Sequence, residues 1–559
     1  MTAVGATGRD GANGEERPAG RASRRRGSHR RPRRPLVIHP LLFAAFPIVF
    51  LWAHNLSEGI TFSDVVRPLA IVVGAAAGLW LVGTLVLRSA RRAGLAVSIL
   101  VLLFFSYGDF YAAIHSWHVA GTHVSVVLMP LWIAIAVAGV ALAVRGGAWL
   151  ATTTTSLNVV AAALVAVNVV SIVVFQVQSN ANTQYLEAGD VHLSHRLLAN
   201  PPPHRPDVYY IILDEYAGAG ALRQVFHYDN SPFLDFLQRK GFYVAANSFT
   251  NYPRTELSVA SSLNMKYLDV LTKQFGPNTG NTEPMAKMLQ FNQVGRVMKS
   301  LGYRYIQIGS WWEPTASSPE ANVNLQYGGT SEFNQLLAGT TAVSQLTDNT
   351  FRLKEYHRVL FQFRALTQLQ HLRGPRFVFA HILCPHDPIV FQRNGAYLTT
   401  DEEEEHSESY NYVNQLIYTN EAVEKAVDAL LSRPPERQPV IVIQSDEGPY
   451  PGEPTSWSAS PNPITLEQKF DILNAYYLPG LERTGLYPTV TPVNTFRVIL
   501  DSYFGAQLPL LPDREYTFVN LKTHVYDFRD VTDLLRADSA VESPSPAAGG
   551  SPSPAASPP

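Results

Sequence analysis

Residues 208–214 read Val-Tyr-Tyr-Ile-Ile-Leu-Asp, an apolar run that ends in a carboxylate. A short apolar run without polar alternation is typical of a strand that is buried on both faces of a parallel sheet. A second run, residues 439–448, reads Pro-Val-Ile-Val-Ile-Gln-Ser-Asp-Glu-Gly and places Asp446 and Glu447 just beyond its apolar part. Both runs predict strands of one sheet with acidic residues at the carboxyl edge, where ligands bind in α/β proteins.

The same alternation of short apolar runs and amphipathic segments extends over residues 206–535. We predict strands at 208–213, 242–246, 304–309, 376–383, 439–444 and 473–478. We predict helices at 231–240, 255–264, 290–301, 409–432 and 493–504. Strands that alternate with helices predict an α/β domain, in which helices flank a mostly parallel sheet.

Residues 36–177 have a different pattern, with five apolar runs, each close to the roughly 20 residues that a helix needs to cross a bilayer. The runs lie at about 36–53, 67–87, 94–114, 123–144 and 157–177. A helix that is apolar around its whole circumference is typical of a membrane span. The predicted fold is therefore a multi-span α-helical membrane region followed by the α/β domain.

Loop charges predict how this region is oriented. Arginines lie in the basic lead at 1–35, between the second and third runs, and at Arg145 between the fourth and fifth runs. The other two loops, 54–66 and 115–122, contain neither lysine nor arginine. Because basic loops stay in the cytoplasm, we expect a cytoplasmic N-terminus. Five spans then place the α/β domain outside the cell membrane.

The remaining segments lack an apolar pattern. The lead at 1–35 is rich in Gly, Arg and Pro, and the tail at 536–559 is rich in Ser, Pro and Ala, so we expect both to be disordered. Residues 178–205 form a proline-stiffened linker. A nucleic-acid-binding arm is the alternative for the basic lead. The membrane interpretation is favoured, and no nucleic-acid partner is expected. The single cysteine, Cys384, excludes an intramolecular disulfide.

Chemistry-bearing side chains follow several of the predicted strands. Asp214 and Asp446 end two of them, His386 follows a third, and Thr255 opens the predicted helix 255–264. Because carboxyl ends of parallel strands share one edge, these side chains should lie close together. Carboxylate and hydroxyl oxygens suit a hard divalent cation such as Mg²⁺ or Mn²⁺. Such a cation would activate the Thr255 hydroxyl as a nucleophile, and the helix start would offer N–H groups to a phosphate oxygen.

The order of the motifs resembles the alkaline phosphatase/sulfatase superfamily. The motifs are strand-Asp, Thr-x-x-Ser near a helix start, His-x-Pro and strand-Asp-x-Gly, and they lie within about 206–505. With membrane spans before it, the domain is most similar to the lipoteichoic acid synthase-like branch. The resemblance implies that Asp214, Thr255, Asp446 and Glu447 bind one metal ion and that Thr255 is also the nucleophile. It implies that His386 contacts the substrate phosphate or assists proton transfer.

The sequence departs from the family pattern at two positions. The family usually has Asp-His-Gly or Asp-Asn-Gly where this chain has Asp446-Glu447-Gly448, and a carboxylate favours Mn²⁺ or Mg²⁺ over the alternatives Zn²⁺ and Ca²⁺. Leu257 replaces the proline of the sulfatase motif. The nucleophile itself distinguishes members of the family, because sulfatases use a formylglycine made from Cys or Ser, which Thr255 cannot form. The resemblance therefore implies transfer of a phosphoglycerol- or phosphoethanolamine-type group, with Ser258 as an alternative nucleophile one turn into the helix.

Other side chains are weaker candidates. Arg254 could bind a phosphate oxygen or be a surface arginine. Trp312 could line a substrate groove or pack on a loop. His381 lies within a predicted strand and is interpreted as a core histidine, whereas Lys469 is interpreted as a solvated lysine.

Together these patterns predict a membrane-bound enzyme that acts on envelope lipids or glycans through a covalent Thr255 intermediate. Two alternatives remain open. One is a hydrolase of the same fold that acts on soluble phosphoesters. The other is a non-catalytic envelope protein that uses the fold for interaction, because Glu447 replaces the usual residue.

Overall fold

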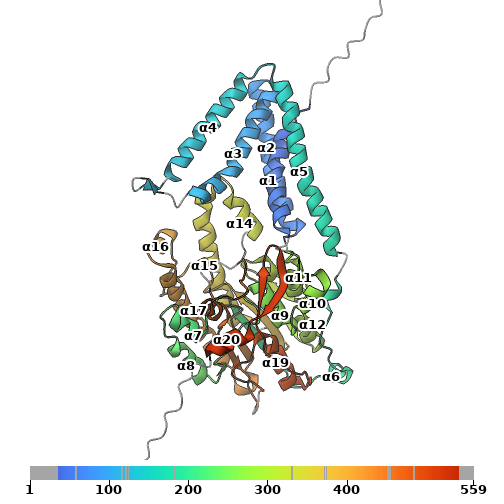
Figure 1. Ribbon diagram of the computed structural model, residues 1–559, viewed down its shortest axis with the longest axis vertical. Coiled ribbons are helices and arrows are strands. Elements are labelled where there is room, and N and C mark those ends of the chain that lie inside the picture. The colour runs from blue at the N-terminus through green and yellow to red at the C-terminus, as the bar shows by residue number, and fades with distance from the viewer. Residues whose placement is uncertain are drawn as a thin grey trace, which may run out of the picture.

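The computed structural model describes residues 36–56, 60–114, 118–119, 122–123, 125–180, 183–328, 331–369, 372, 374–449, 455–481 and 485–539. An N-terminal bundle of long helices stands on an α/β domain, and α14 and α15 reach from the domain toward the bundle (Figure 1). The predicted disorder of residues 1–35 lies outside the described residues, as does that of residues 540–559 in the tail. Residues 536–539 of the predicted tail belong to the last helix.

An apolar helix occurs at each of the five predicted spans. The helices are α1 (His39–His54), α2 (Phe62–Leu87), α3 (Ala90–Ile114), α4 (Ser125–Arg145) and α5 (Leu150–Asn180). Four of them, α2 to α5, are long and apolar enough to cross a membrane. The first helix has 16 residues, so a fifth span stays a prediction. Side chains such as Val86, which is 73% exposed, give α2 an apolar outer surface suited to lipid.

The α/β domain is joined to the bundle through α14 (Glu332–Gly339) and the residues that follow it. The Gly108 N–H in α3 donates to the Thr340 carbonyl at 2.9 Å, and the Phe104 carbonyl accepts from the Ala342 N–H at 2.8 Å. The segment after α14 therefore replaces an internal hydrogen bond of α3. Gly108 permits this approach, because a Cβ atom there would lie 1.8 Å from the Gly339 carbonyl oxygen.

The domain is built on a seven-stranded sheet of order β4-β9-β8-β3-β7-β5-β6. The strands are β3 (Val208–Leu213), β4 (Tyr243–Val244), β5 (Arg304–Ile308), β6 (Val323–Leu325), β7 (Arg376–Ile382), β8 (Val440–Gln444) and β9 (Asn474–Tyr477). Strands β8, β3, β7, β5 and β6 pair in parallel, and β9 runs antiparallel to its neighbours β8 and β4. The prediction of a mostly parallel sheet is confirmed, although β6 was not predicted.

Helices cover both faces of the sheet. They are α7 (Ala219–Gln224), α8 (Ser231–Arg239), α9 (Thr255–Asn264), α10 (Asp269–Phe275), α11 (Glu283–Gln290), α12 (Gln293–Ser300), α13 (Glu313–Ala316), α15 (Ser344–Gln368), α16 (Thr400–Glu404), α17 (Glu408–Leu431), α18 (Pro463–Phe470), α19 (Thr495–Phe504) and α20 (Thr532–Ser539). A short helix, α6 (His195–Ala199), lies in the segment before β3, and a hairpin of β10 (Tyr516–Asn520) and β11 (His524–Asp530) lies near the C-terminus.

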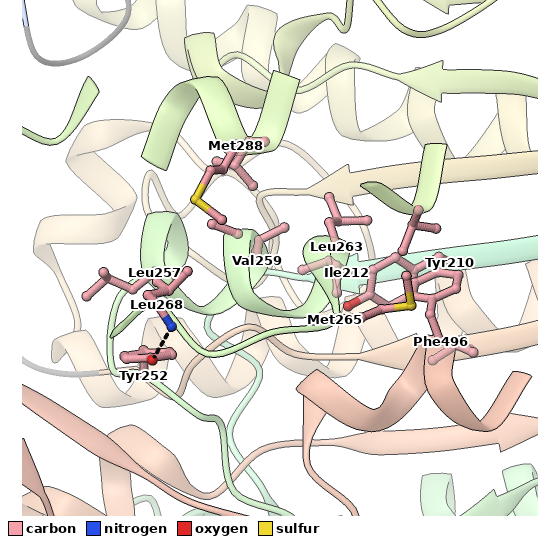
Figure 2. Close-up of a cluster of buried hydrophobic side chains, with 14 of the residues drawn as sticks. Tyr210, Ile212, Tyr252, Leu257, Val259, Leu263, Met265, Leu268, Met288 and Phe496 are labelled. Atoms are coloured by element: carbon pink, nitrogen blue, oxygen red, sulfur yellow. Dashed lines mark hydrogen bonds between the residues drawn. The ribbon is translucent and has the colours of Figure 1, made fainter. Parts of the chain in front are cut away.

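Strand β3 divides its side chains between two cores, as a strand buried on both faces does. Tyr210 and Ile212 belong to the core that includes Leu263 of α9 and Phe496 of α19 (Figure 2). Tyr209, Ile211 and Leu213 belong to the opposite core, with side chains of α15 and α17. Because both cores pack on the same strand, its carboxyl end is held firmly in place.

Candidate active site

Three ionisable side chains come together where β3, β7 and β8 end. Asp214 follows β3 and Asp446 lies two residues beyond β8, whereas His381 lies in β7 opposite Ile212 of β3. His381 Nε2 lies 3.3 Å from Asp214 Oδ2 and 3.9 Å from Asp446 Oδ2. One ligand atom from each of the three residues falls within a 4.8 Å group. The carboxyl edge of the sheet therefore brings Asp214 and Asp446 together, as expected, and adds His381.

This group fits a divalent metal ion. Asp214 Oδ1, His381 Nε2 and Asp446 Oδ2 are buried and, within the described residues, have no hydrogen-bond partner. Buried polar atoms are nearly always satisfied, so an unpartnered atom on each of three adjoining side chains points to a shared ligand. The other atoms of these side chains are held: His381 Nδ1 lies 2.8 Å from Thr315 Oγ1, and Asp446 Oδ1 accepts from the Glu447 N–H at 2.9 Å. Such outer contacts fix the orientation of metal ligands.

Burial and neighbouring charges at this edge raise the pKa values of two carboxyl groups. Burial, with the nearby charge of Asp214, raises the pKa of Asp446 to about 7. Burial also raises the pKa of Glu447 to about 8, against the opposing effect of the Lys469 ammonium. The charge of Asp214 disfavours the ionisation of Asp446, which a cation between these two carboxylates would relieve.

Thr255 is the first residue of α9 and lies beside this group. Its hydroxyl donates to Glu447 Oε1 at 3.2 Å, and the side chain is half-buried. Ser258, the alternative nucleophile, is 2% exposed, and its hydroxyl lies 2.9 Å from that of Thr250. Ser258 therefore belongs to the packing behind the site, and Thr255 is the hydroxyl at its edge.

Two weaker interpretations change with the structure. Lys469, interpreted as solvated, is wholly buried at the site, where its Nζ lies 3.0 Å from Glu447 Oε2 and 3.3 Å from Glu215 Oε1. It can be buried because two carboxylates compensate its charge. His381 is buried, as expected of a core histidine, but one ring nitrogen faces Asp214 and Asp446 rather than a satisfied partner.

The remaining candidates surround the same edge. The backbone N–H of His386 donates to the backbone carbonyl of Asp214 at 3.2 Å. Burial would lower the pKa of His386, but the charges of Asp214 and Glu215 raise it to about 10. Arg254 precedes Thr255, and its Nε lies 3.2 Å from Glu256 Oε1. The Trp312 ring stands 6.0 Å from the His381 ring at an angle of 77°. The structure thus collects all of the predicted site residues around one edge.

Comparisons with known proteins identify the family of the chain. A family model described as Sulfatase matches residues 206–496, more than half of the chain. This match confirms the predicted resemblance to the alkaline phosphatase/sulfatase superfamily. No curated protein matches the chain.

Several solved structures are similar at low identity. The C-terminal periplasmic domain of EcEptC from Escherichia coli is 14% identical, with a TM-score of 0.38, covering 60% of this chain and 95% of that chain. The integral membrane protein lipooligosaccharide phosphoethanolamine transferase A (EptA) from Neisseria meningitidis is 13% identical, with a TM-score of 0.37, covering 84% of this chain and 95% of that chain. BT1596, a 2-O GAG sulfatase, is 13% identical, with a TM-score of 0.34, covering 57% of this chain and 78% of that chain.

Proposed function

We propose that this chain, which belongs to the sulfatase family, is a membrane-bound enzyme that transfers a phosphoryl-type group through a covalent Thr255 intermediate. The observation that carries the proposal is the buried group of Asp214, His381 and Asp446, each with an unpartnered polar atom, beside the Thr255 hydroxyl. A divalent metal ion satisfies such atoms and needs a nucleophile close by to be catalytic.

The metal would be held by Asp214, His381 and Asp446, with the Thr255 hydroxyl as a further ligand. Three carboxylate or hydroxyl ligands with a single imidazole favour Mn²⁺ or Mg²⁺, with Zn²⁺ and Ca²⁺ as alternatives. When bound, the ion would lower the pKa of the Thr255 hydroxyl and neutralise charge on the phosphoryl oxygens. Glu447, which the sequence resemblance also implies as a ligand, is held here by Lys469.

The proposed transfer reaction has two steps. In the first step the Thr255 oxygen attacks phosphorus and gives up its hydroxyl proton, the bond from phosphorus to the donor's leaving oxygen breaks, and that proton ends on the leaving oxygen. In the second step a hydroxyl of the acceptor, or water, attacks the phosphothreonine, the bond from phosphorus to Thr255 Oγ1 breaks, and Thr255 Oγ1 takes up the proton that the attacking oxygen gives up. His386 carries positive charge beside Asp214 and would contact a phosphoryl oxygen, and Arg254 would contact another.

The identity of the nucleophile favours phosphorus over sulfur. Sulfatases of this family use an aldehyde made from Cys or Ser, and a threonine side chain carries a methyl group that prevents the same conversion. A threonine ester of a phosphoryl group forms by simple displacement. We therefore propose a phosphoglycerol- or phosphoethanolamine-type donor rather than a sulfate ester.

The position of the site supports a substrate from the membrane or the envelope. Trp312, which stands over His381, precedes α13, and the Glu313 N–H donates to Glu332 Oε2 of α14 at 3.4 Å. Helix α14 packs against α1 and α2 of the bundle, with Phe333 and Leu337 in the same apolar cluster as Phe43 and Ile48. The route from the site to the bundle is thus short, and we propose a lipid or an envelope glycan as substrate.

Turnover by the full chain in detergent tests this function. We expect the chain to release p-nitrophenolate from bis(p-nitrophenyl) phosphate in the presence of Mn²⁺. Thr255→Ala and Asp446→Asn should each lower the rate by at least about 100-fold, because each removes a group of the reacting centre. Glu436→Gln, an exposed change in the segment before β8, is the control and should leave the rate unchanged. Full activity in Thr255→Ala would exclude the covalent mechanism.

A further inference from the structure

Lys469 is a buried ammonium with two carboxylate partners. Its side chain is fully buried, and its Nζ lies 3.0 Å from Glu447 Oε2 and 3.3 Å from Glu215 Oε1. Removing an ammonium ion from water costs several kcal/mol unless opposite charge compensates it. The position of the Glu447 carboxylate is therefore set by Lys469 as well as by the strand end that carries it.

The two oxygens of Glu447 face different groups, and Oε2 meets Lys469 as an ion pair without a hydrogen-bond partner among the described residues. Oε2 faces Lys469, and Oε1 accepts a hydrogen bond from the Thr255 hydroxyl at 3.2 Å. A metal ion on Oε2 would bring a second positive charge close to the ammonium, which like-charge repulsion opposes. The group of ligand atoms within 4.8 Å contains Asp214, His381 and Asp446 but not Glu447.

We infer that Glu447 is a positioning residue for the nucleophile rather than a metal ligand, and that Lys469 holds it in that role. This inference rests on the proposed function, in which Thr255 attacks phosphorus. Because the hydroxyl donates to Glu447 Oε1, its hydrogen is directed toward Glu447 and the lone pairs of the oxygen stay available. Fixing the orientation of an attacking group is worth large factors in rate.

Glu447, which stands in place of the usual family residue, and the buried Lys469 compensate each other's charge. The family usually places histidine or asparagine at the position of Glu447, and neither needs a buried cation beside it. A carboxylate at this position does need a buried cation beside it, because an unpaired buried charge is costly. Replacing Lys469 alone takes the ammonium away from both Glu447 and Glu215, so replacing Glu447 and Lys469 together by uncharged residues of similar size should be better tolerated.

Mn²⁺ binding to the full chain in detergent tests this inference. The variants are Glu447→Gln, Asp446→Asn and the double variant Glu447→Gln/Lys469→Met, with Glu436→Gln as a control. We expect Glu447→Gln and the double variant to bind Mn²⁺ with native stoichiometry and an unchanged electron paramagnetic resonance spectrum. Asp446→Asn should lose the ion. The double variant is used in place of Lys469→Met alone, because it removes the ammonium without leaving the Glu447 carboxylate unpaired.

Turnover of bis(p-nitrophenyl) phosphate supplies the second readout. Glu447→Gln should lower kcat by roughly 10- to 100-fold and leave KM unchanged, since a neutral amide oxygen that no longer pairs with Lys469 orients the Thr255 hydroxyl less well than the carboxylate does, while the metal ligands stay in place. Loss of Mn²⁺ or an altered spectrum in Glu447→Gln would overturn the inference, and so would a native kcat. Activity retained by Thr255→Ala would instead remove the proposed function, while the Mn²⁺ spectra would still decide whether Glu447 is a ligand.

Discussion

His381 Nε2 lies 3.3 Å from Asp214 Oδ2, which joins the carboxyl ends of β7 and β3 across one buried contact. His381 Nε2 is buried without a hydrogen-bond partner among the described residues, so it is not a satisfied core atom. We therefore expect His381→Ala to weaken Mn²⁺ binding by about 100-fold or more, through loss of a direct ligand. Calorimetric titration of Mn²⁺ measures this. The exposed His406→Ala is the control, and native affinity in His381→Ala would show that the imidazole is only a core residue.

Thr315 should matter for the metal without touching it. Its hydroxyl lies 2.8 Å from His381 Nδ1 and so fixes the ring with Nε2 toward the carboxylates. Removing a contact of this kind typically costs 10- to 100-fold in metal affinity. Thr315→Val keeps the volume of the side chain, so we expect weaker Mn²⁺ binding with the fold retained. Thr315→Ser keeps the hydroxyl and should bind as the native chain does. Equal affinity in the valine and serine variants would argue against this role.

Gly108 should be indispensable for the junction between bundle and domain. A Cβ atom there would lie 1.8 Å from the Gly339 carbonyl oxygen, so Gly108→Ala must displace the segment that hydrogen-bonds to α3. We expect destabilisation of about 2 kcal/mol or more, seen as a lower thermal midpoint in detergent. Gly78→Ala in α2 is a matched control, because a Cβ there meets nothing within 4 Å. Identical midpoints for the two variants would mean that the segment does not dock as described.

Stability should depend on pH through Glu313. Burial, with contributions from Asp64 and Glu332, raises the pKa of Glu313 from 4.5 to about 7. The folded state therefore holds this proton at pH values where the unfolded chain has lost it, and stability falls as pH rises from about 4.5 to 7. Glu313→Gln should remove this component, so its thermal midpoint should match that of the native chain near pH 4.5 and exceed it near pH 8. A constant difference across this range would exclude the assignment.

The sequence was sufficient to predict most of the sheet, because β3, β7 and β8 are apolar runs buried on both faces. Several elements were not predicted, and for two of them the physical reason is clear. Strand β6 is a three-residue strand at the edge of the sheet, and only part of its surface is buried. Helix α15 buries polar side chains among its apolar ones, including the ion pair between Glu355 and Arg358, and these interrupt the apolar periodicity that marks a helix.

The site was predictable where one residue follows a strand, as Asp214 and Asp446 do. His381 and Lys469 depend on tertiary contacts instead. The role of His381 follows from the register that sets Ile212 of β3 opposite it, and local sequence does not encode this register. Lys469 and Glu215 are 254 residues apart in the chain, so no spacing rule could pair them. Local patterns thus predict which strand ends carry carboxylates, and the packing decides which cation faces them.

Mass spectrometry of the chain after incubation with membrane lipids and Mn²⁺ tests whether Thr255 forms the covalent intermediate. We expect a phosphoryl, glycerophosphoryl or phosphoethanolamine adduct on the peptide that contains Thr255, and no adduct in Thr255→Ala. The adduct should also disappear in Asp446→Asn, which keeps the nucleophile but loses a metal ligand. An adduct on Ser258 or elsewhere, or an unmodified Thr255 in a chain that turns over its substrate, would rule out Thr255 as the nucleophile.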